Sequence, residues 1–419
     1  MKVGGIVHVP GDKSISHRAL ILAALADGTS VITDILESAD IASTASVLRT
    51  LGVLVPPLAA RIEIAGLGRR GLHAPTQPLD CGNSGTTARL MAGVVAGHPF
   101  TGRFVGDASL SRRPMHRIAR PLEAMGARVT FEKGDGLPME VQGGALRGIR
   151  WESETASAQV KSAALLAGLV AGVPVVVREP SRSRDHTERM LRAAGAELDI
   201  VGEVVRLEPV ARLAPLAMRV PGDPSSAAFI AALAVLATDG ALTVPDLCLN
   251  PTRTGFFRAL QRMGGRIEFH LGAPQGGEEM GTLFAWPSAL RAMEFGAADV
   301  PAMIDELPLL ACVAARAEGT TVIRGASELR VKESDRIAAV VQNLRAIGVT
   351  AEELPDGLRV TGGAGALSGA VRTFGDHRIA MAFGVLAALP GSTIAVDDPA
   401  CVAVSYPAFW DDLRAAVSA

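Results

Sequence analysis

Val9–Val31 reads VPGDKSISHRALILAALADGTSV, and Val220–Val244 reads VPGDPSSAAFIAALAVLATDGALTV. Both stretches contain Val-Pro-Gly-Asp, a short polar turn, an apolar run of helical length, a glycine and a β-branched segment. Looser copies of the pattern occur four more times, with the closing glycines 68 to 79 residues apart. The six closing glycines are Gly28, Gly97, Gly172, Gly240, Gly319 and Gly391. Self-similarity at a nearly fixed period indicates one supersecondary unit used repeatedly, so the sequence predicts six structural repeats.

Each repeat has the same expected order of elements. Small polar residues typical of helix N-caps precede an Ala/Leu-rich helix, and a glycine and a short β-branched strand such as Thr320–Ile323 follow it. A second helix comes next, and strands follow that helix. In five repeats the second helix ends on a glycine, as expected of a helix C-cap: Gly52, Gly126, Gly195, Gly264 and Gly348. The repeat therefore reads β-α-β-α-β-β.

The repeats are expected to form two groups of three. First helices such as Ala227–Leu236 are apolar nearly all round, which predicts burial within a bundle, whereas second helices such as Asp185–Ala194 have a charged face. This pattern places the first helices inside and the sheets outside. Because the near-duplicate begins at Val220, we expect one domain of residues 12–221 inserted into a second domain made of residues 1–11 and 222–419.

Composition excludes several classes of protein. Of the 419 residues 48% are hydrophobic and 20% charged, and the net charge is −2, which gives no general attraction to nucleic acid or to an anionic membrane. The N-terminus lacks the apolar core of a signal peptide, and the longest apolar run, Ala163–Val177, is shorter than a membrane span. A cytoplasmic protein is expected. Four cysteines without CxxC spacing predict neither disulfides nor a zinc site, but small buried residues: Cys81, Cys248, Cys312 and Cys401.

The polar clusters occupy one place in the repeat, the turn that begins the buried helix. Helix N-termini bind anions, because their N–H groups are unpaired and the helix dipole is positive there. Capping alone explains GDPSS, but the extra cations of GDKSISHR and FGDHR favour a function. The clusters are GDKSISHR (Gly11–Arg18), GNSGTTAR (Gly82–Arg89), SAQVK (Ser157–Lys161), GDPSS (Gly222–Ser226), IDELP (Ile304–Pro308) and FGDHR (Phe374–Arg378).

Further cations are Arg113, Arg184, Lys332 and Arg336. Singly, each is typical of a solvated surface, and Lys332–Arg336 could simply begin an amphipathic helix. His186 and Glu188 show no metal-ligand spacing and are interpreted as surface residues. A nearly neutral chain that gathers cations beside helix starts indicates a small substrate with several negative charges.

GDKSISHR, GNSGTTAR, SRRP, SAQ, RVKESDR and GDHR, in this order along the whole chain, closely resemble the enolpyruvylshikimate-phosphate synthases. The resemblance implies transfer of the enolpyruvyl (carboxyvinyl) group of phosphoenolpyruvate to the 5-hydroxyl of shikimate 3-phosphate, with release of phosphate, in the shikimate pathway to chorismate and the aromatic amino acids. It implies an α/β (α+β) fold, the two-domain inverse α/β barrel of enolpyruvyl transferases. This fold has six βαβαββ repeats, three per domain, and the active site lies in the cleft between the domains. It further implies a monomer whose partners are these two anionic substrates, with no cofactor, metal, nucleic acid or membrane.

Residue roles follow from the resemblance alone. Shikimate 3-phosphate would be bound by Lys13, Ser14, Arg18, Ser157, Ala158, Gln159, Arg184, Asp305 and Lys332, with Arg18 on its carboxylate and Asp305 and Lys332 at the target hydroxyl. Phosphoenolpyruvate would be bound by Lys13, Asn83, Gly85, Arg113, Gln159, Arg336 and Arg378, with Arg336 and Arg378 on its carboxylate. Asp305, Glu333 and Lys13 would be catalytic, with Glu333 as proton donor and acceptor. Two acid–base groups and a cationic cage suit a reaction that protonates one carbon, attacks its neighbour and expels phosphate.

The chain departs from the family pattern in a few places. Val404 occupies a position where the family often has lysine, and Ala158 replaces a serine. SAQ, RDHTE and Asn250–Arg253 (NPTR) are similar to the class II subgroup, which includes enzymes tolerant of the phosphoenolpyruvate competitor glyphosate. Gly85, however, is the residue of sensitive members, where tolerant ones carry alanine, so intermediate sensitivity is expected.

Two alternatives stand beside this interpretation. The sister enzyme that acts on UDP-N-acetylglucosamine shares the fold, but it carries Lys-Asn near its start and a reactive loop cysteine. This chain has Lys13-Ser14, and its cysteines lie in other contexts. A non-enzymatic repeat scaffold would have interchangeable turns, whereas these turns differ and hold most of the cations. An assay of phosphate release with phosphoenolpyruvate and shikimate 3-phosphate together distinguishes these two alternatives from the first interpretation.

Overall fold

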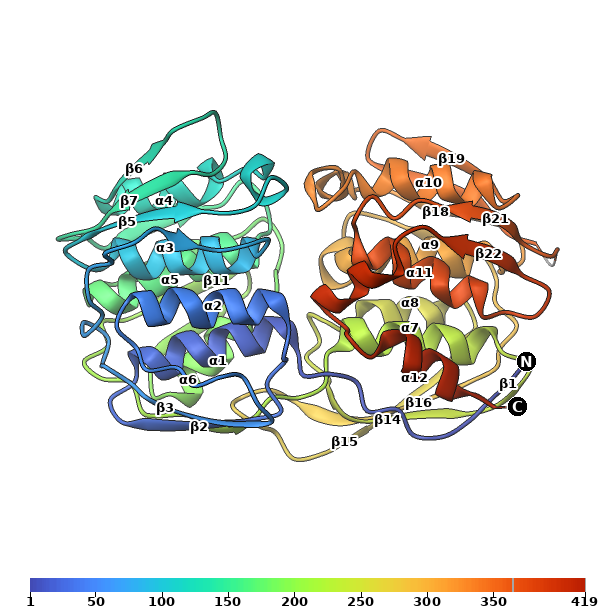
Figure 1. The fold of residues 1–419 in the computed structure, drawn as a ribbon, viewed down its shortest axis with the longest axis horizontal. Coiled ribbons are helices and arrows are strands. Elements are labelled where there is room, and N and C mark those ends of the chain that lie inside the picture. Colours follow the sequence, from blue (N-terminus) through green and yellow to red (C-terminus); the bar gives the residue numbers. More distant parts are fainter. Residues whose placement is uncertain (364, 419) are drawn as a thin grey trace. The chain divides into compact units, whose positions relative to one another are not determined.

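The computed structural model describes residues 1–363 and 365–418, which form two compact units (Figure 1). Unit 2 consists of Gly11–Val220 and the short segment Pro274–Glu278. Unit 1 consists of Met1–Pro10, Pro221–Ala273 and Glu279–Ala419. The chain thus passes from one unit to the other near residues 10 and 220, and twice more around the segment 274–278.

Unit 2 contains three repeats, coloured blue to green in Figure 1. The second and third have the order β-α-β-α-β-β, whereas the sheet of the first has three strands, one of them from the end of the unit. Its three sheets have the strand orders β12-β2-β3, β4-β5-β7-β6 and β10-β11-β9-β8. Each sheet has one parallel pairing, β12 with β2, β4 with β5 or β8 with β9, and the other pairings are antiparallel. The helices are α1 (Lys13–Leu25), α2 (Ala39–Thr50), α3 (Gly85–Ala96), α4 (His116–Met125), α5 (Ala158–Ala171) and α6 (His186–Ala193). The strands are β2 (Thr29–Thr33), β3 (Arg61–Ala65), β4 (Leu79–Asp80), β5 (Thr101–Val105), β6 (Arg128–Phe131), β7 (Met139–Gln142), β8 (Ile149–Glu152), β9 (Val175–Arg178), β10 (Leu198–Val201), β11 (Val204–Leu207) and β12 (Ala217–Arg219).

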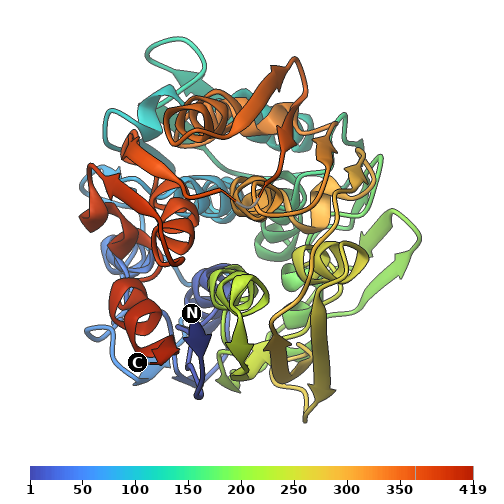
Figure 2. The ribbon, with the colours of Figure 1, turned by 90° about the vertical axis from the view of Figure 1, so that its right-hand side faces the viewer.

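Unit 1 also contains six α-helices among its described residues, and Figure 2 shows its helices nearly end-on with strands around them. Its sheets have the orders β13-β1-β23, β14-β16-β15, β17-β18-β20-β19 and β21-β22. The α-helices are α7 (Pro224–Leu236), α8 (Gly255–Arg262), α9 (Leu307–Ala314), α10 (Arg336–Ala346), α11 (His377–Ala387) and α12 (Phe409–Ala416), and the 3₁₀ turns used below are η3 (Ile304–Glu306) and η4 (Ser327–Val331). The strands are β1 (Lys2–Val3), β13 (Asp239–Gly240), β14 (Leu242–Cys248), β15 (Arg266–Leu271), β16 (Met280–Trp286), β17 (Glu294–Phe295), β18 (Thr320–Ile323), β19 (Thr350–Leu354), β20 (Gly357–Thr361), β21 (Ser368–Val371), β22 (Thr393–Val396) and β23 (Val417–Ser418).

The first helices form the cores, as the sequence predicted. Every residue of α1 from Ile15 to Leu25 is buried, and all of α7 is buried except Leu236. In unit 2, α3 and α5 cross so closely that a Cβ on Gly93 would lie 2.2 Å from the carbonyl oxygen of Ala163. Glycine at that position therefore permits a helix contact that any side chain would block. The closing glycines of the second helices are also confirmed, because all five have positive φ angles between 86° and 111°.

Two sequence-based expectations need correction. His186 and Glu188 are buried, not surface residues, because each has a charged partner: Glu278 lies 2.7 Å from His186, and Lys161 lies 2.8 Å from Glu188. Of the four cysteines, Cys81, Cys248 and Cys312 are buried, but Cys401 is only half-buried. Within the described residues, no helix is both long and apolar enough to span a membrane.

Candidate active site

The six polar clusters lie where the sequence predicted them, at the starts of the first helices α1, α3, α5, α7, α9 and α11. Five of these helices are capped by a side chain that accepts a backbone N–H from the first turn. The caps are Asp12, Ser84, Ser157, Asp223 and Asp376. The sixth helix, α9, begins at Leu307, and its N-cap Glu306 makes no such bond. Capping therefore accounts for one residue in each of five clusters and leaves the cations to be explained.

The first cluster places two cations on α1 of unit 2. The ammonium of Lys13 pairs with the buried carboxylate of Asp40. The guanidinium of Arg18 is buried and donates to Thr187 Oγ1 at 2.7 Å, to Ser162 Oγ at 2.9 Å and to the Ser14 carbonyl at 3.0 Å. Burial lowers the pKa of Arg18 to about 10, so it keeps its charge at neutral pH. These three bonds use three of the five guanidinium N–H groups and leave Arg18 able to donate to a carboxylate.

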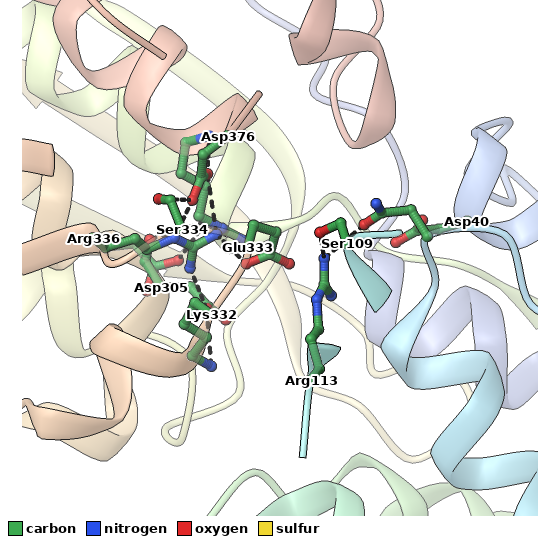
Figure 3. A network of polar contacts seen from close by, with 12 residues as sticks. Asp40, Ser109, Arg113, Asp305, Lys332, Glu333, Ser334, Arg336 and Asp376 are labelled. Atoms are coloured by element: carbon green, nitrogen blue, oxygen red, sulfur yellow. Dashed lines mark hydrogen bonds and ion pairs between the residues drawn. The ribbon is translucent and has the colours of Figure 1, made fainter. Parts of the chain in front are cut away.

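The turn before α3 brings together a second predicted set. Arg113 donates to Asn83 Oδ1 at 2.6 Å and to Ser109 Oγ at 3.4 Å (Figure 3). Asn83 donates in turn to Asp107 at 2.5 Å, which fixes the amide. Gln159, at the start of α5, donates to Thr86 Oγ1 at 3.1 Å, so two of the helix starts in this unit are joined through one side chain.

Arg89 is a residue of this region to which the sequence interpretation gave no role. Its NH1 group donates to Gln159 Oε1 at 2.8 Å, and NH1 lies 2.8 Å from the point where a Cβ on Gly85 would stand. A signal was present, since Gly85 and Arg89 are four residues apart and thus share one face of the helix. Arg89 therefore borders both Gly85 and Gln159.

The third cluster is supported by buried ion pairs. Glu179 accepts the backbone N–H of Ser157 at 3.0 Å, and Lys161 pairs with Glu179 at 2.7 Å and with Glu188 at 2.8 Å. Burial alone would lower the pKa of Lys161, but the two carboxylates raise it above its ordinary value. Burial raises the pKa of Glu188, with Lys161 opposing the rise. These pairs tie the start of α5 to the Arg184–Glu188 segment.

In unit 1, one arginine joins three carboxylates (Figure 3). Arg336, the first residue of α10, is only 1% exposed. Its guanidinium donates to Asp376 from Nε at 2.8 Å and from NH2 at 3.2 Å, to Glu333 Oε2 at 2.7 Å and to Asp305 Oδ1 at 3.3 Å. Arg336 thus holds Asp305 and Glu333, two of the predicted catalytic residues, on one planar group.

The electrostatics of this arrangement favour the charged forms. Burial by itself would lower the pKa of Arg336, but Asp376 and Glu333 raise it well above its ordinary value. Burial would likewise raise the pKa of Asp376, but Arg336 holds it below its usual range. The pair is therefore ionised at neutral pH, and the charge of Arg336 is fixed.

Lys332 and Arg378 complete the set in unit 1. Lys332 follows η4, and its ammonium lies 3.6 Å from Asp305 Oδ1. Arg378, on α11, donates from NH1 to the carbonyl oxygen of Asp305 at 3.2 Å and to Glu306 Oε1 at 3.4 Å. The short turn η3 therefore presents the Asp305 carboxylate to Lys332 and Arg336. It presents the carbonyl oxygen of Asp305 and the carboxylate of Glu306 to Arg378. Together these groups can bind an anion and exchange protons with it.

Comparison with known proteins identifies the family of this chain. The family EPSP synthase (3-phosphoshikimate 1-carboxyvinyltransferase) matches residues 1–413. Curated 3-phosphoshikimate 1-carboxyvinyltransferases from Sulfurihydrogenibium sp. and Desulforamulus reducens are each 45% identical to this chain, over 99% of the chain and 97% of the relative. A solved EPSP synthase from Acinetobacter baumannii has a TM-score of 0.87 and 38% identity, covering 99% of this chain and 96% of that structure. The enolpyruvyl transferase NikO from Streptomyces tendae, with a TM-score of 0.79, 20% identity and coverages of 99% and 95%, shares the fold. A match over nearly the full length, by family, by sequence and by structure, shows that this chain belongs to the EPSP synthase family.

Proposed function

We propose that Asp305, Glu333 and Lys13 are the catalytic residues with which this chain makes 5-enolpyruvylshikimate 3-phosphate and phosphate from phosphoenolpyruvate and shikimate 3-phosphate, and that Lys332 acts beside Asp305 at the target hydroxyl. The observation that carries the proposal is the arrangement around Arg336, which holds the carboxylates of Asp305 and Glu333 together with the Lys332 ammonium nearby. The family match over residues 1–413 supports the overall reaction.

The reaction needs protons at two places. In the addition step a proton goes to the methylene carbon of phosphoenolpyruvate, the 5-hydroxyl oxygen bonds to the adjacent carbon, and the hydroxyl proton leaves. In the elimination step the new methyl group loses a proton, and the bond between the central carbon and the phosphate oxygen breaks. We assign the proton of the carbon to Glu333 and the proton of the hydroxyl to Asp305 with Lys332. Each group then reverses its role in the second step, as general acid–base catalysis requires.

Shikimate 3-phosphate is assigned to cations and hydroxyls of unit 2. Arg18 suits the carboxylate, because its buried guanidinium is fixed by Thr187, Ser162 and Ser14 and can still donate. The rest of this substrate is assigned to six residues of the same unit: Lys13, Ser14, Ser157, Ala158, Gln159 and Arg184. The bond from the Ser157 N–H to Glu179 fixes the position of Ser157, and the bond from Gln159 to Thr86 fixes its amide, which supports this assignment.

Phosphoenolpyruvate is assigned to residues of both units. Its phosphate is assigned to Lys13, Arg113, Gln159 and the Asn83–Gly85 turn. Arg336 and Arg378 are assigned to its carboxylate. Since Arg336 is already bonded to three carboxylates, the substrate carboxylate would have to share the guanidinium with Asp305 or Glu333, or replace one of them. Arg378 has the longer, weaker contacts and is the better candidate for the main carboxylate ligand.

Phosphate release is the direct test of the whole proposal. Release should require both shikimate 3-phosphate and phosphoenolpyruvate, with one phosphate per 5-enolpyruvylshikimate 3-phosphate formed. Release with UDP-N-acetylglucosamine in place of shikimate 3-phosphate would favour the sister activity, and no release with either acceptor would favour a scaffold. Because every assigned residue belongs to one chain, we propose that the monomer is active, which light scattering during turnover can check.

A further inference from the structure

The fourth repeat begins with the cluster GDPSS, the copy in which Pro224 and Ser225 stand where the first repeat has Lys13 and Ser14. We propose that Ser225 and Arg253 hold the carboxylate of Glu306, and that Glu306 is a positioning residue that orients the guanidinium of Arg378 toward the carboxylate of phosphoenolpyruvate. The inference rests on the role proposed above for Arg378. It assigns a task in the reaction to a cluster whose sequence indicates only a helix cap.

The first link is the contact between η3 and Arg378. NH1 of Arg378 donates to the Asp305 carbonyl at 3.2 Å and to Glu306 Oε1 at 3.4 Å. Both acceptors belong to one 3₁₀ turn, so the turn holds NH1 from two directions. Both bonds are longer than the 2.7–2.9 Å typical of a charge-assisted bond. Arg378 is therefore oriented and still able to bind a better-placed carboxylate.

The second link holds Glu306. Ser225 Oγ makes a short hydrogen bond to Glu306 Oε1, and Arg253 NH2 donates to Ser225 Oγ at 2.8 Å. A guanidinium can only donate and a carboxylate can only accept, so the direction of the bonds is fixed. Ser225 accepts from Arg253 and gives its single hydrogen to Glu306. Arg253 is itself fixed by Asp223 Oδ1 at 2.8 Å.

Helix capping does not explain these side chains. The N-cap of α7 is Asp223, which accepts the Ser225 N–H, so the Ser225 hydroxyl is not needed as a cap. Glu306 precedes α9 but makes no capping bond with its side chain. Glu306 is only 2% exposed, and its Oε2 has no hydrogen-bond partner among the described residues. A buried carboxylate is costly. Glu306 contacts Ser225 and Arg378, so orientation of Arg378 is the function that fits.

The test compares Michaelis constants for the two substrates. Ser225→Ala removes the donor that fixes Glu306, and a lost hydrogen bond to a charged group should raise the KM for phosphoenolpyruvate by roughly tenfold. The KM for shikimate 3-phosphate and kcat should change less than about twofold, because only the orientation of Arg378 is affected. Ser225→Thr keeps a hydroxyl and should restore most of the affinity. Ser226→Ala, a neighbouring buried serine outside the chain of contacts, is the matched control and should leave all three constants unchanged.

A double-mutant cycle separates this inference from the function on which it rests. Arg378→Ala should raise the KM for phosphoenolpyruvate, and Ser225→Ala should then add nothing. If Arg378→Ala leaves that KM unchanged, the role proposed for Arg378 is wrong. If Arg378→Ala raises it but Ser225→Ala does not, or if Ser225→Ala has its full effect in the Arg378→Ala background, the positioning role of Ser225 and Glu306 is wrong.

Glu306→Gln provides the same comparison should Ser225→Ala fail to fold. Glutamine keeps an oxygen that accepts from Ser225 and Arg378, so the KM for phosphoenolpyruvate should stay within about threefold of the parent protein, whereas Glu306→Ala should raise it roughly tenfold. Equal effects of the glutamine and alanine variants, or equal changes in both Michaelis constants, would overturn the proposal.

Discussion

At the scale of the residue, the strongest feature of the molecule is the sharing of Arg336 between Asp305 and Glu333. Both carboxylates bond to the same planar group, so their positions are linked to one buried cation. Arg336 also donates from Nε and NH2 to Asp376, the N-cap of α11, and this two-point contact fixes the guanidinium. The proposed acid–base groups, Asp305 and Glu333, are thus held by a residue that does not itself need to change its charge.

Glu333→Gln tests the proton transfer. Glutamine keeps the shape and the bond to Arg336 but cannot ionise, so kcat should fall on the order of a hundredfold or more while binding of shikimate 3-phosphate is kept. Asp305→Asn should behave in the same way. The control is Asp335→Asn, because Asp335 caps α10 by accepting from Ala338 and asparagine is an equally good cap. Parallel losses of binding and turnover in Glu333→Gln would indicate that Glu333 is structural.

Gly85→Ala tests discrimination against glyphosate. The added methyl would lie 2.8 Å from Arg89 NH1 and 3.4 Å from Arg113 NH1, so the space beside Gly85 is bordered by two guanidinium groups. Arg89 can yield, because its contact is the far end of a flexible side chain. We expect the inhibition constant for glyphosate to rise by a larger factor than the KM for phosphoenolpyruvate, both measured by phosphate release. Equal factors would mean that the methyl acts only by displacing Arg89 and Gln159, and does not select by ligand size.

At the scale of the element, a line of buried polar groups joins three helices of unit 2. His17 Nδ1 on α1 lies 2.7 Å from Thr44 Oγ1 on α2, which lies 2.6 Å from Thr87 Oγ1 on α3, and Thr87 donates to the cap Ser84 at 2.8 Å. Helices α1 and α3, which carry predicted substrate ligands, are therefore connected through uncharged side chains. Burial lowers the pKa of His17 to about 3, although Asp40 opposes the shift, so the imidazole is neutral at pH 7.

This line predicts a specific pH dependence of stability. Below pH 6.5 the unfolded chain binds a proton at His17 that the folded protein refuses, so the free energy of unfolding falls as the pH drops toward 3. Between pH 7 and pH 5 this loss approaches about 2 kcal/mol. His17→Asn removes it, so the stability difference between the variant and the parent should shrink over this range in urea unfolding. Exposed His270→Asn is the control. A pH-independent difference for His17→Asn would show that His17 is not the group that titrates.

The elements themselves could be predicted because their signals are local. N-cap residues, apolar runs and closing glycines lie within a few residues of the helices that they specify, and β18 coincides with the expected strand Thr320–Ile323. Partners from distant repeats have no such signal. Arg18 meets Thr187 across 169 residues and Ser225 meets Glu306 across 81 residues. The same reason explains the error at His186 and Glu188, whose burial depends on Glu278 and Lys161 from other parts of the chain.

At the scale of the whole molecule, the assigned ligands are divided between the two units. Lys13, Arg18, Arg113 and Arg184 belong to unit 2, and Lys332, Arg336 and Arg378 belong to unit 1. If one pair of substrates uses both sets, binding should draw the units together. We expect small-angle scattering to show a smaller radius of gyration with shikimate 3-phosphate and an unreactive phosphoenolpyruvate analogue than without them. An Arg378→Ala protein should compact less, and an unchanged radius in the parent protein would contradict the expectation.

The segment Pro274–Glu278 determines how unit 2 can be expressed as a separate fragment. It belongs to unit 2, where Glu278 Oε1 lies 2.7 Å from His186 Nδ1 and both side chains are fully buried. A recombinant fragment of residues 11–220 would therefore lack Glu278, a partner of the buried His186. It would also lack Gly277, which lies against the carbonyl of Arg189. Such a fragment should express poorly and recover when a peptide of residues 272–280 is supplied in trans. Fragment complementation between the two units would accordingly succeed only where residues 274–278 are supplied together with residues 11–220.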